Sequence, residues 1–145
     1  MPNTNLKELL ELTRKAQASD LHLSAGHLPI LRIDGNLTPL AKEKPLLPED
    51  TEFLARSLMS ESLYARLLTE KEIDFSYNFD NKARFRINAF FQGGNISLAL
   101  RLIPSKIRSI EELGLPPILH EFTGAKQGFV LVTGPSGQGK STTLA

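Results

Sequence analysis

Apolar side chains recur every three or four residues in three stretches of the chain, and this spacing predicts three amphipathic helices. The first is expected at residues 6–17, where Asn5 and Glu8 have the spacing of an N-terminal capping pair. The other two are expected on either side of Ser60, a residue type that favours the start of a helix. Their apolar positions, which should face a core, are Leu54, Leu58, Met59, Leu63, Leu67 and Leu68.

In other segments apolar and polar residues alternate with a period of two, which predicts strands. These segments are 19–24, 30–33, 37–40, 73–79, 83–92 and 95–103. Asp34 and Gly35 predict a tight hairpin between the second and third strands, and Pro39 suits an edge strand. Pro104 and a helix-like segment at 109–114 then separate this mixed α/β (α+β) unit from the remainder. We therefore expect one domain at residues 1–104 and the start of another at 105–145.

The last two strands are expected to form a hairpin around Gly93 and Gly94. In that register every pair on one face is apolar, whereas the other face sets Arg86 directly across from Arg101, with Arg84 nearby. Two adjacent like charges are unfavourable unless something neutralises them. The sequence leaves two interpretations open. The arginines bind an anion such as a nucleotide phosphate, or they are solvated or paired with Asp74 or Asp80 on the neighbouring strand.

Residues 134–141 read GPSGQGKS and match the phosphate-loop pattern G-x-x-x-x-G-K-[ST]. The apolar segment 129–132 before them predicts a buried strand, which is the usual context of this motif. Lys140 is expected to reach the β- and γ-phosphates of ATP or GTP, and Ser141 to offer its hydroxyl to Mg²⁺. A chance glycine-rich turn is the alternative. The predicted nucleotide-binding residues are Gly134, Pro135, Ser136, Gly137, Gln138, Gly139, Lys140, Ser141 and Thr142.

Composition and charge argue against several classes of protein, among them nucleic-acid-binding and membrane-spanning proteins. Seventeen basic and sixteen acidic residues among 145 give a formal charge of +1, which argues against nucleic acid as a main partner. No apolar run approaches the length of about 18 residues that a membrane helix needs, so no direct membrane insertion is expected. The absence of cysteine and of a signal-peptide pattern favours a cytoplasmic protein. Three scattered histidines predict no metal site, and His22 beside Asp20 is interpreted as a hydrogen-bonded structural histidine.

Taken together, six segments resemble the PilT family, the retraction ATPases of bacterial type IV pili within the type II/IV secretion ATPase superfamily. They span residues 18–26, 32–35, 74–77, 84–88, 100–106 and 134–144. The resemblance implies a PAS-like N-terminal domain followed by a RecA-like ATPase domain, with nucleotide between them. It also implies a homo-hexamer that works with the pilus machinery at the inner-membrane platform. Arg86 and Arg101 match the family's phosphate-contacting arginines, whereas Arg84 is a weaker match.

The resemblance thus implies a motor ATPase that powers pilus retraction and twitching motility, with Lys140, Arg86 and Arg101 as its catalytic residues and ATP and Mg²⁺ as its cofactors. The family's Asp box, Walker B and His box would lie beyond Ala145, so the 145 residues alone are expected to be inactive. Two alternatives remain. One is a pilus-assembly or type II secretion ATPase, which the early position of the residues 19–23 motif disfavours. The other is a non-enzymatic PAS-like interaction module.

Overall fold

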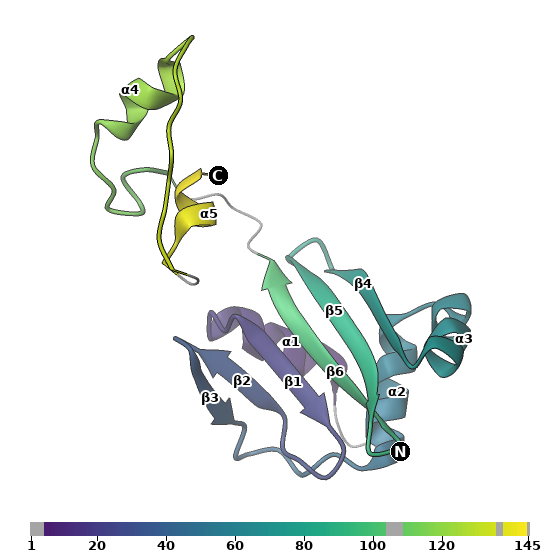
Figure 1. Ribbon diagram of the computed structural model, residues 1–145. Helices are drawn as coiled ribbons and strands as arrows, with labels where there is room; N and C mark the ends of the chain where they lie inside the picture. Colours follow the sequence, from purple (N-terminus) through teal and green to yellow (C-terminus); the bar gives the residue numbers. More distant parts are fainter. Residues whose placement is uncertain (1–4, 104–108, 136–137, 145) are drawn as a thin grey trace. The chain divides into compact units, whose positions relative to one another are not determined.

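The computed structural model describes residues 5–103, 109–135 and 138–144. It divides into two compact units, Met1–Ser105 and Lys106–Ala145. Each unit is described by itself below, with the element labels of Figure 1.

The first unit is built on an antiparallel sheet of six strands in the order β3-β2-β1-β6-β5-β4 (Figure 1). All six expected strands are present, with bounds that differ from the expected ones by at most one residue at either end. They are β1 (Asp20–Ser24), β2 (Ile30–Ile33), β3 (Asn36–Pro39), β4 (Glu72–Phe79), β5 (Ala83–Gln92) and β6 (Asn95–Ile103). As Pro39 suggested, β3 lies at an edge of the sheet. Proline has no backbone N–H group to donate, and an edge strand tolerates that loss because it has a neighbouring strand on one side only. The mixed α/β class is confirmed.

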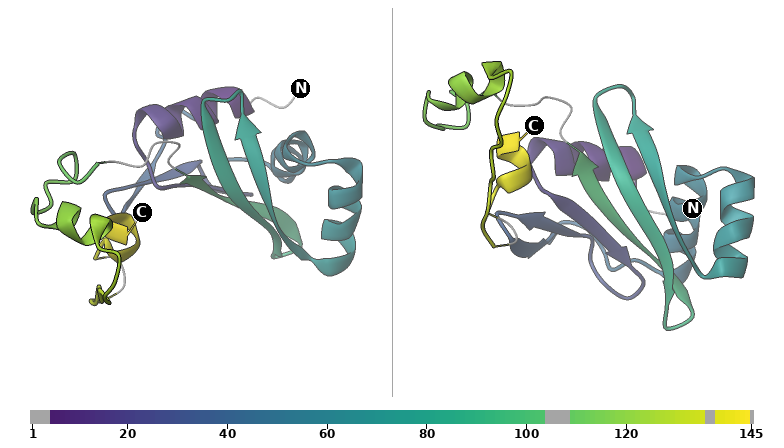
Figure 2. Two further views of the ribbon diagram at one scale, coloured as in Figure 1. Left: turned by 90° about the horizontal axis from the view of Figure 1, so that it is seen from above. Right: turned by 45° about the horizontal axis from the view of Figure 1, so that its top comes forward.

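The described residues of this unit also form three helices: α1 (Leu6–Lys15), α2 (Pro48–Leu58) and α3 (Glu61–Glu70). The expected caps are both confirmed, because the Asn5 side chain accepts from the Lys7 backbone N–H and the Ser60 hydroxyl accepts from that of Leu63. Helices α1 and α2 lie on the same face of the sheet, behind it in Figure 1 and seen from another side in Figure 2. The core between them includes the fully buried side chains Leu10, Leu21, Leu54, Phe85, Ile87 and Leu100.

The hairpin of β5 and β6 has the expected register. Arg86 pairs with Arg101, and the apolar pairs Phe85–Leu102 and Ile87–Leu100 occupy the other face. Gly93 and Gly94 both have positive φ angles, +58° and +84°, which the two central residues of a type I′ turn require. The face that carries Arg86 and Arg101 is opposite the one that α1 and α2 cover, and we call it the open face of the sheet.

The second unit, as far as it is described, contains two short helices, α4 (Leu119–Gly124) and α5 (Lys140–Leu144). The expected helix-like segment at 109–114 is a single turn, in which Ser109 and Glu112 cap each other's backbone N–H groups. Helix α4 was not predicted, because its six residues are too few to show a helical pattern of apolar positions. Pro104, the expected boundary residue, lies outside the described residues.

The prediction of a buried strand at residues 129–132 is wrong. This segment has no strand pairing, and the Phe129 and Leu131 side chains are 86% and 70% exposed. A strand needs a neighbour to accept its backbone hydrogen bonds and a layer to cover its side chains, and the described part of this unit contains no other strand. The apolar pattern is present in the sequence, but the partners that would make it a strand are absent from these residues.

Candidate functional site

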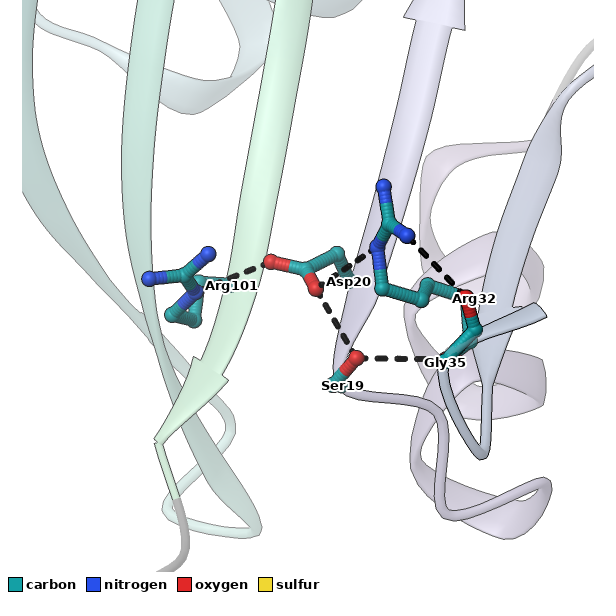
Figure 3. A network of polar contacts seen from close by, with 5 residues as sticks. All are labelled: Ser19, Asp20, Arg32, Gly35 and Arg101. Carbon is teal, nitrogen blue, oxygen red and sulfur yellow. Dashed lines mark hydrogen bonds and ion pairs between the residues drawn. The ribbon is translucent and has the colours of Figure 1, made fainter. Parts of the chain in front are cut away.

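Four charged side chains form one row across the open face. The strand registers place Asp20 of β1 between Arg32 of β2 and Arg101 of β6, and they place Arg101 beside Arg86 of β5. Figure 3 shows the part of this row around Asp20. The row alternates in charge except between Arg101 and Arg86, where two positive groups are adjacent.

Asp20 is the anchor of this row, since its carboxylate is contacted from three residues (Figure 3). The Arg101 Nε donates to its Oδ1 at 2.9 Å, and the Ser19 hydroxyl donates to its Oδ2 at 2.8 Å. The Arg32 Nε lies 3.5 Å from the same Oδ2, while an Nη of Arg32 donates to the Gly35 carbonyl. Burial, the largest influence, opposes ionisation of Asp20, but the hydrogen bonds from Arg101 and Ser19 help to hold its pKa below the ordinary value. Asp20 is therefore ionised at neutral pH.

The two adjacent arginines remain accessible despite their carboxylate partners. The Arg101 side chain is 71% exposed, and that of Arg86 is 65% exposed with its Nε 3.5 Å from Asp74. Both line a hollow of about 280 Å³ together with Asp20, Asp74, Asn88 and Ala99. An anion entering this hollow would meet two guanidinium groups, which carry planar, multiple donors suited to phosphate oxygens.

Of the partners expected for the arginine pair, the structure bears out Asp74 for Arg86. Sequence reasoning missed Asp20 as the partner of Arg101. The period-two pattern does place Asp20 on the polar side of its strand, but it does not reveal that β1 lies beside β6, which joins residues 81 positions apart. Arg84, the third arginine considered, donates to the Ser76 hydroxyl at 3.3 Å instead.

His22 lies on β1 two residues after Asp20 and differs from the expectation of a hydrogen-bonded histidine. Its Nε2 is buried and has no hydrogen-bond partner among the residues described. Burial lowers the pKa of His22, and the neighbouring Asp20 carboxylate only partly offsets that effect. The imidazole of His22, on strand β1, is thus uncharged at neutral pH.

We expect His22 to make folding sensitive to acid. Because its pKa is lower in the folded protein than in the unfolded chain, the unfolded chain takes up a proton first as the pH falls below about 6.5. Stability should therefore fall with pH in this range and be unaffected by His22 above it. Urea denaturation at about pH 5 and about pH 7.5 measures this, with His22→Leu as the non-titrating variant. An equal pH dependence in the two proteins would contradict the assignment, because the two proteins differ only at residue 22.

In the second unit, the lysine of the phosphate-loop sequence contacts a backbone carbonyl of the same sequence. The Lys140 Nζ donates to the Pro135 carbonyl at 2.6 Å, and α5 begins at Lys140. Gly139 has a φ of +79°, a conformation that a side chain at this position would disfavour. Ser141 and Thr142 are exposed on the first turn of α5. Of the predicted nucleotide-binding residues, Ser136 and Gly137 lie outside the described residues.

Each unit therefore carries a candidate site of its own, an arginine pair in the first unit and a phosphate-loop sequence in the second. In the described ranges, no group of three or more acidic or histidine side chains is arranged to hold a metal ion by itself. Likewise, no helix there is both long enough and apolar enough to cross a membrane.

Comparison with known proteins identifies relatives over nearly the whole chain, although no family model matches it. The chain is 40% identical over 141 residues to the type IV pilus retraction ATPase PilT of Pseudomonas aeruginosa, covering 97% of this chain and 41% of that protein. It is 38% identical over 117 residues to a twitching motility protein of Neisseria gonorrhoeae, covering 81% of this chain and 31% of that protein.

A solved structure agrees with the sequence comparison. The crystal structure of the pilus retraction motor PilT with bound ADP superimposes with a TM-score of 0.81 at 42% identity, covering 98% of this chain and 41% of that one. The chain thus spans about two fifths of the length of PilT. Agreement in sequence and in fold over the same residues shows common descent, and the chain is a homologue of the PilT group of pilus ATPases over the N-terminal part of those proteins.

Proposed function

We propose that this chain is the N-terminal, nucleotide-binding part of a hexameric motor ATPase that powers type IV pilus retraction and twitching motility. The observation that carries the proposal is a complete phosphate-loop sequence in a chain homologous to an ADP-binding retraction motor. In this proposal residues 1–104 form a PAS-like domain, and residues 105–145 form a linker and the start of a RecA-like ATPase domain. The motor acts in the cytoplasm, on the pilus machinery at the inner-membrane platform.

Each part of the candidate site has a role in this proposal. Residues 134–142 bind the phosphates of ATP through backbone N–H groups, as glycine-rich loops of this kind do. Lys140 exchanges its hydrogen bond with the Pro135 carbonyl for the β- and γ-phosphates. Arg86 and Arg101 contact the transferred phosphoryl group, whose negative charge offsets the repulsion between them.

Mg²⁺ fits the exposed hydroxyl of Ser141, because this ion takes oxygen ligands and is commonly held by few protein groups together with phosphate oxygens and water. Bound there, the ion would neutralise charge on the phosphates of ATP.

The proposal is tested by measuring steady-state ATPase activity and particle size of the native gene product, including any residues beyond Ala145, beside the 145-residue chain. We expect ring-sized particles that hydrolyse ATP from the native product, and a small, inactive species from the 145 residues. A native product that neither binds nor hydrolyses ATP would contradict the motor and favour a non-enzymatic interaction module. An active product that does not support pilus retraction in cells would favour an assembly or secretion ATPase.

A further inference from the structure

The two arginines of the candidate site are held very differently. Arg86 has a loose partner, since Asp74 lies 3.5 Å from its Nε and is itself 53% exposed. Arg101 has a fixed partner, because Asp20 is only 10% exposed, accepts a hydrogen bond from Ser19 and forms an ion pair with Arg32. A carboxylate held by several groups can fix the direction of a guanidinium, whereas an exposed carboxylate moves with it.

The contact between Asp20 and Arg101 engages the guanidinium at its Nε edge, through a hydrogen bond of 2.9 Å (Figure 3). The side chain as a whole stays 71% exposed, so the arginine is oriented without being covered. Ser19 and Arg32 approach the other carboxylate oxygen, Oδ2, and thereby leave Oδ1 to Arg101. This division of the two oxygens gives Asp20 a defined geometry toward a single partner on β6.

We propose that Asp20 is a positioning residue, which holds Arg101 beside Arg86 in the orientation that contacts a nucleotide phosphate. This inference rests on the proposed function, and it adds a role that the sequence did not reveal. Orientation matters because a misplaced group loses much of its stabilisation of a transition state, even when its charge is still present. Asp20 itself would touch neither nucleotide nor metal.

Asp20→Asn in the native gene product tests the proposal, because it keeps the size of the side chain and removes its charge. We expect kcat for ATP hydrolysis to fall about 10-fold, with a smaller change in KM. Asp80→Asn is the matched control. It removes the same charge from an exposed turn after β4, where the side chain does not line the hollow, and it should change kcat less than about twofold. Equal losses in the two variants would show that the charge of this unit matters rather than positioning, and would overturn the proposal.

A double-mutant cycle separates positioning from a general effect on folding. In a protein that already carries Arg101→Ala, Asp20→Asn should cause no further loss of kcat, because there is no guanidinium left to orient. Losses that multiply would overturn the proposal. If Asp20→Asn does not fold, Ser19→Ala replaces it, with a smaller loss expected and an unchanged kcat contradicting the inference.

The outcomes also separate this inference from the proposed function. If Arg101→Ala hydrolyses ATP at the wild-type rate, the phosphate-contacting role of the arginine fails and the inference fails with it. If Arg101→Ala is slow while Asp20→Asn is as fast as the wild type, the function stands and only the positioning role is overturned.

Discussion

Lys140→Ala is expected to lower ATP hydrolysis by the native gene product about 10³-fold. The lysine is the only charged side chain in the segment 134–142, so no neighbour in the loop can replace it. Its Nζ is held by the Pro135 carbonyl, a neutral acceptor that an anionic phosphate would displace readily. Steady-state phosphate release measures the effect, and nucleotide binding measured by fluorescence shows whether affinity falls as well.

Lys126→Ala is the matched control for this experiment, because it removes an exposed lysine from the same unit outside the phosphate-loop sequence. Its turnover should stay within about twofold of the wild type. Normal hydrolysis by Lys140→Ala in a correctly folded protein would exclude the phosphate loop as the nucleotide site.

Arg101→Ala should lower kcat about 10²-fold or more, a typical loss when a charged donor to a transferring phosphoryl group is removed. The ground for expecting a large effect is the geometry of the open face, where Arg101 is exposed, oriented by Asp20 and adjacent to a second arginine. The variant removes the hydrogen bond that Arg101 donates to Asp20, so thermal denaturation is used to check that the variant protein folds. Arg101→Lys provides a second test, since it keeps the charge but not the planar fork, and it too should be slow.

Arg84→Ala is the control for the arginine experiment. Arg84 lies on the same strand and face as Arg86, but its guanidinium donates to Ser76 and it does not line the hollow. We expect its kcat to remain close to that of the wild type. A wild-type rate for Arg101→Ala would assign Arg101 to the solvated surface, and its ion pair with Asp20 would then be structural only.

The sequence predicted the first unit well because its signals are local. The period of two in β5 and β6, with Gly93 and Gly94 between them, determined the register and hence the adjacency of Arg86 and Arg101. The caps at Asn5 and Ser60 depend on side chains within three residues of the backbone groups they bind. A one-residue shift of the hairpin would have exchanged the buried and polar faces, so the alternation leaves little freedom.

What the sequence did not predict depends on contacts between distant segments. The pairing of β1 with β6 brings Asp20 to Arg101, and no local pattern indicates which strand β1 will join. The expected strand at 129–132 failed for the opposite reason, since its local pattern was clear but the described residues of that unit offer no partner strand. The roles of the phosphate loop and of the arginine pair stay predictions until the variants are measured.

The strand order has a consequence for how the site assembles. Strands β2 and β3 form one local hairpin, and β5 and β6 form another. The pairing of β1 with β6, by contrast, joins segments about 80 residues apart, so a long loop of chain must close before these two strands can meet. The hydrogen bond between Asp20 and Arg101 connects these two strands. Arg101 therefore reaches its final orientation only when the two halves of the sheet have joined, and by mass action an anion that binds only the joined form would in turn favour the joined state.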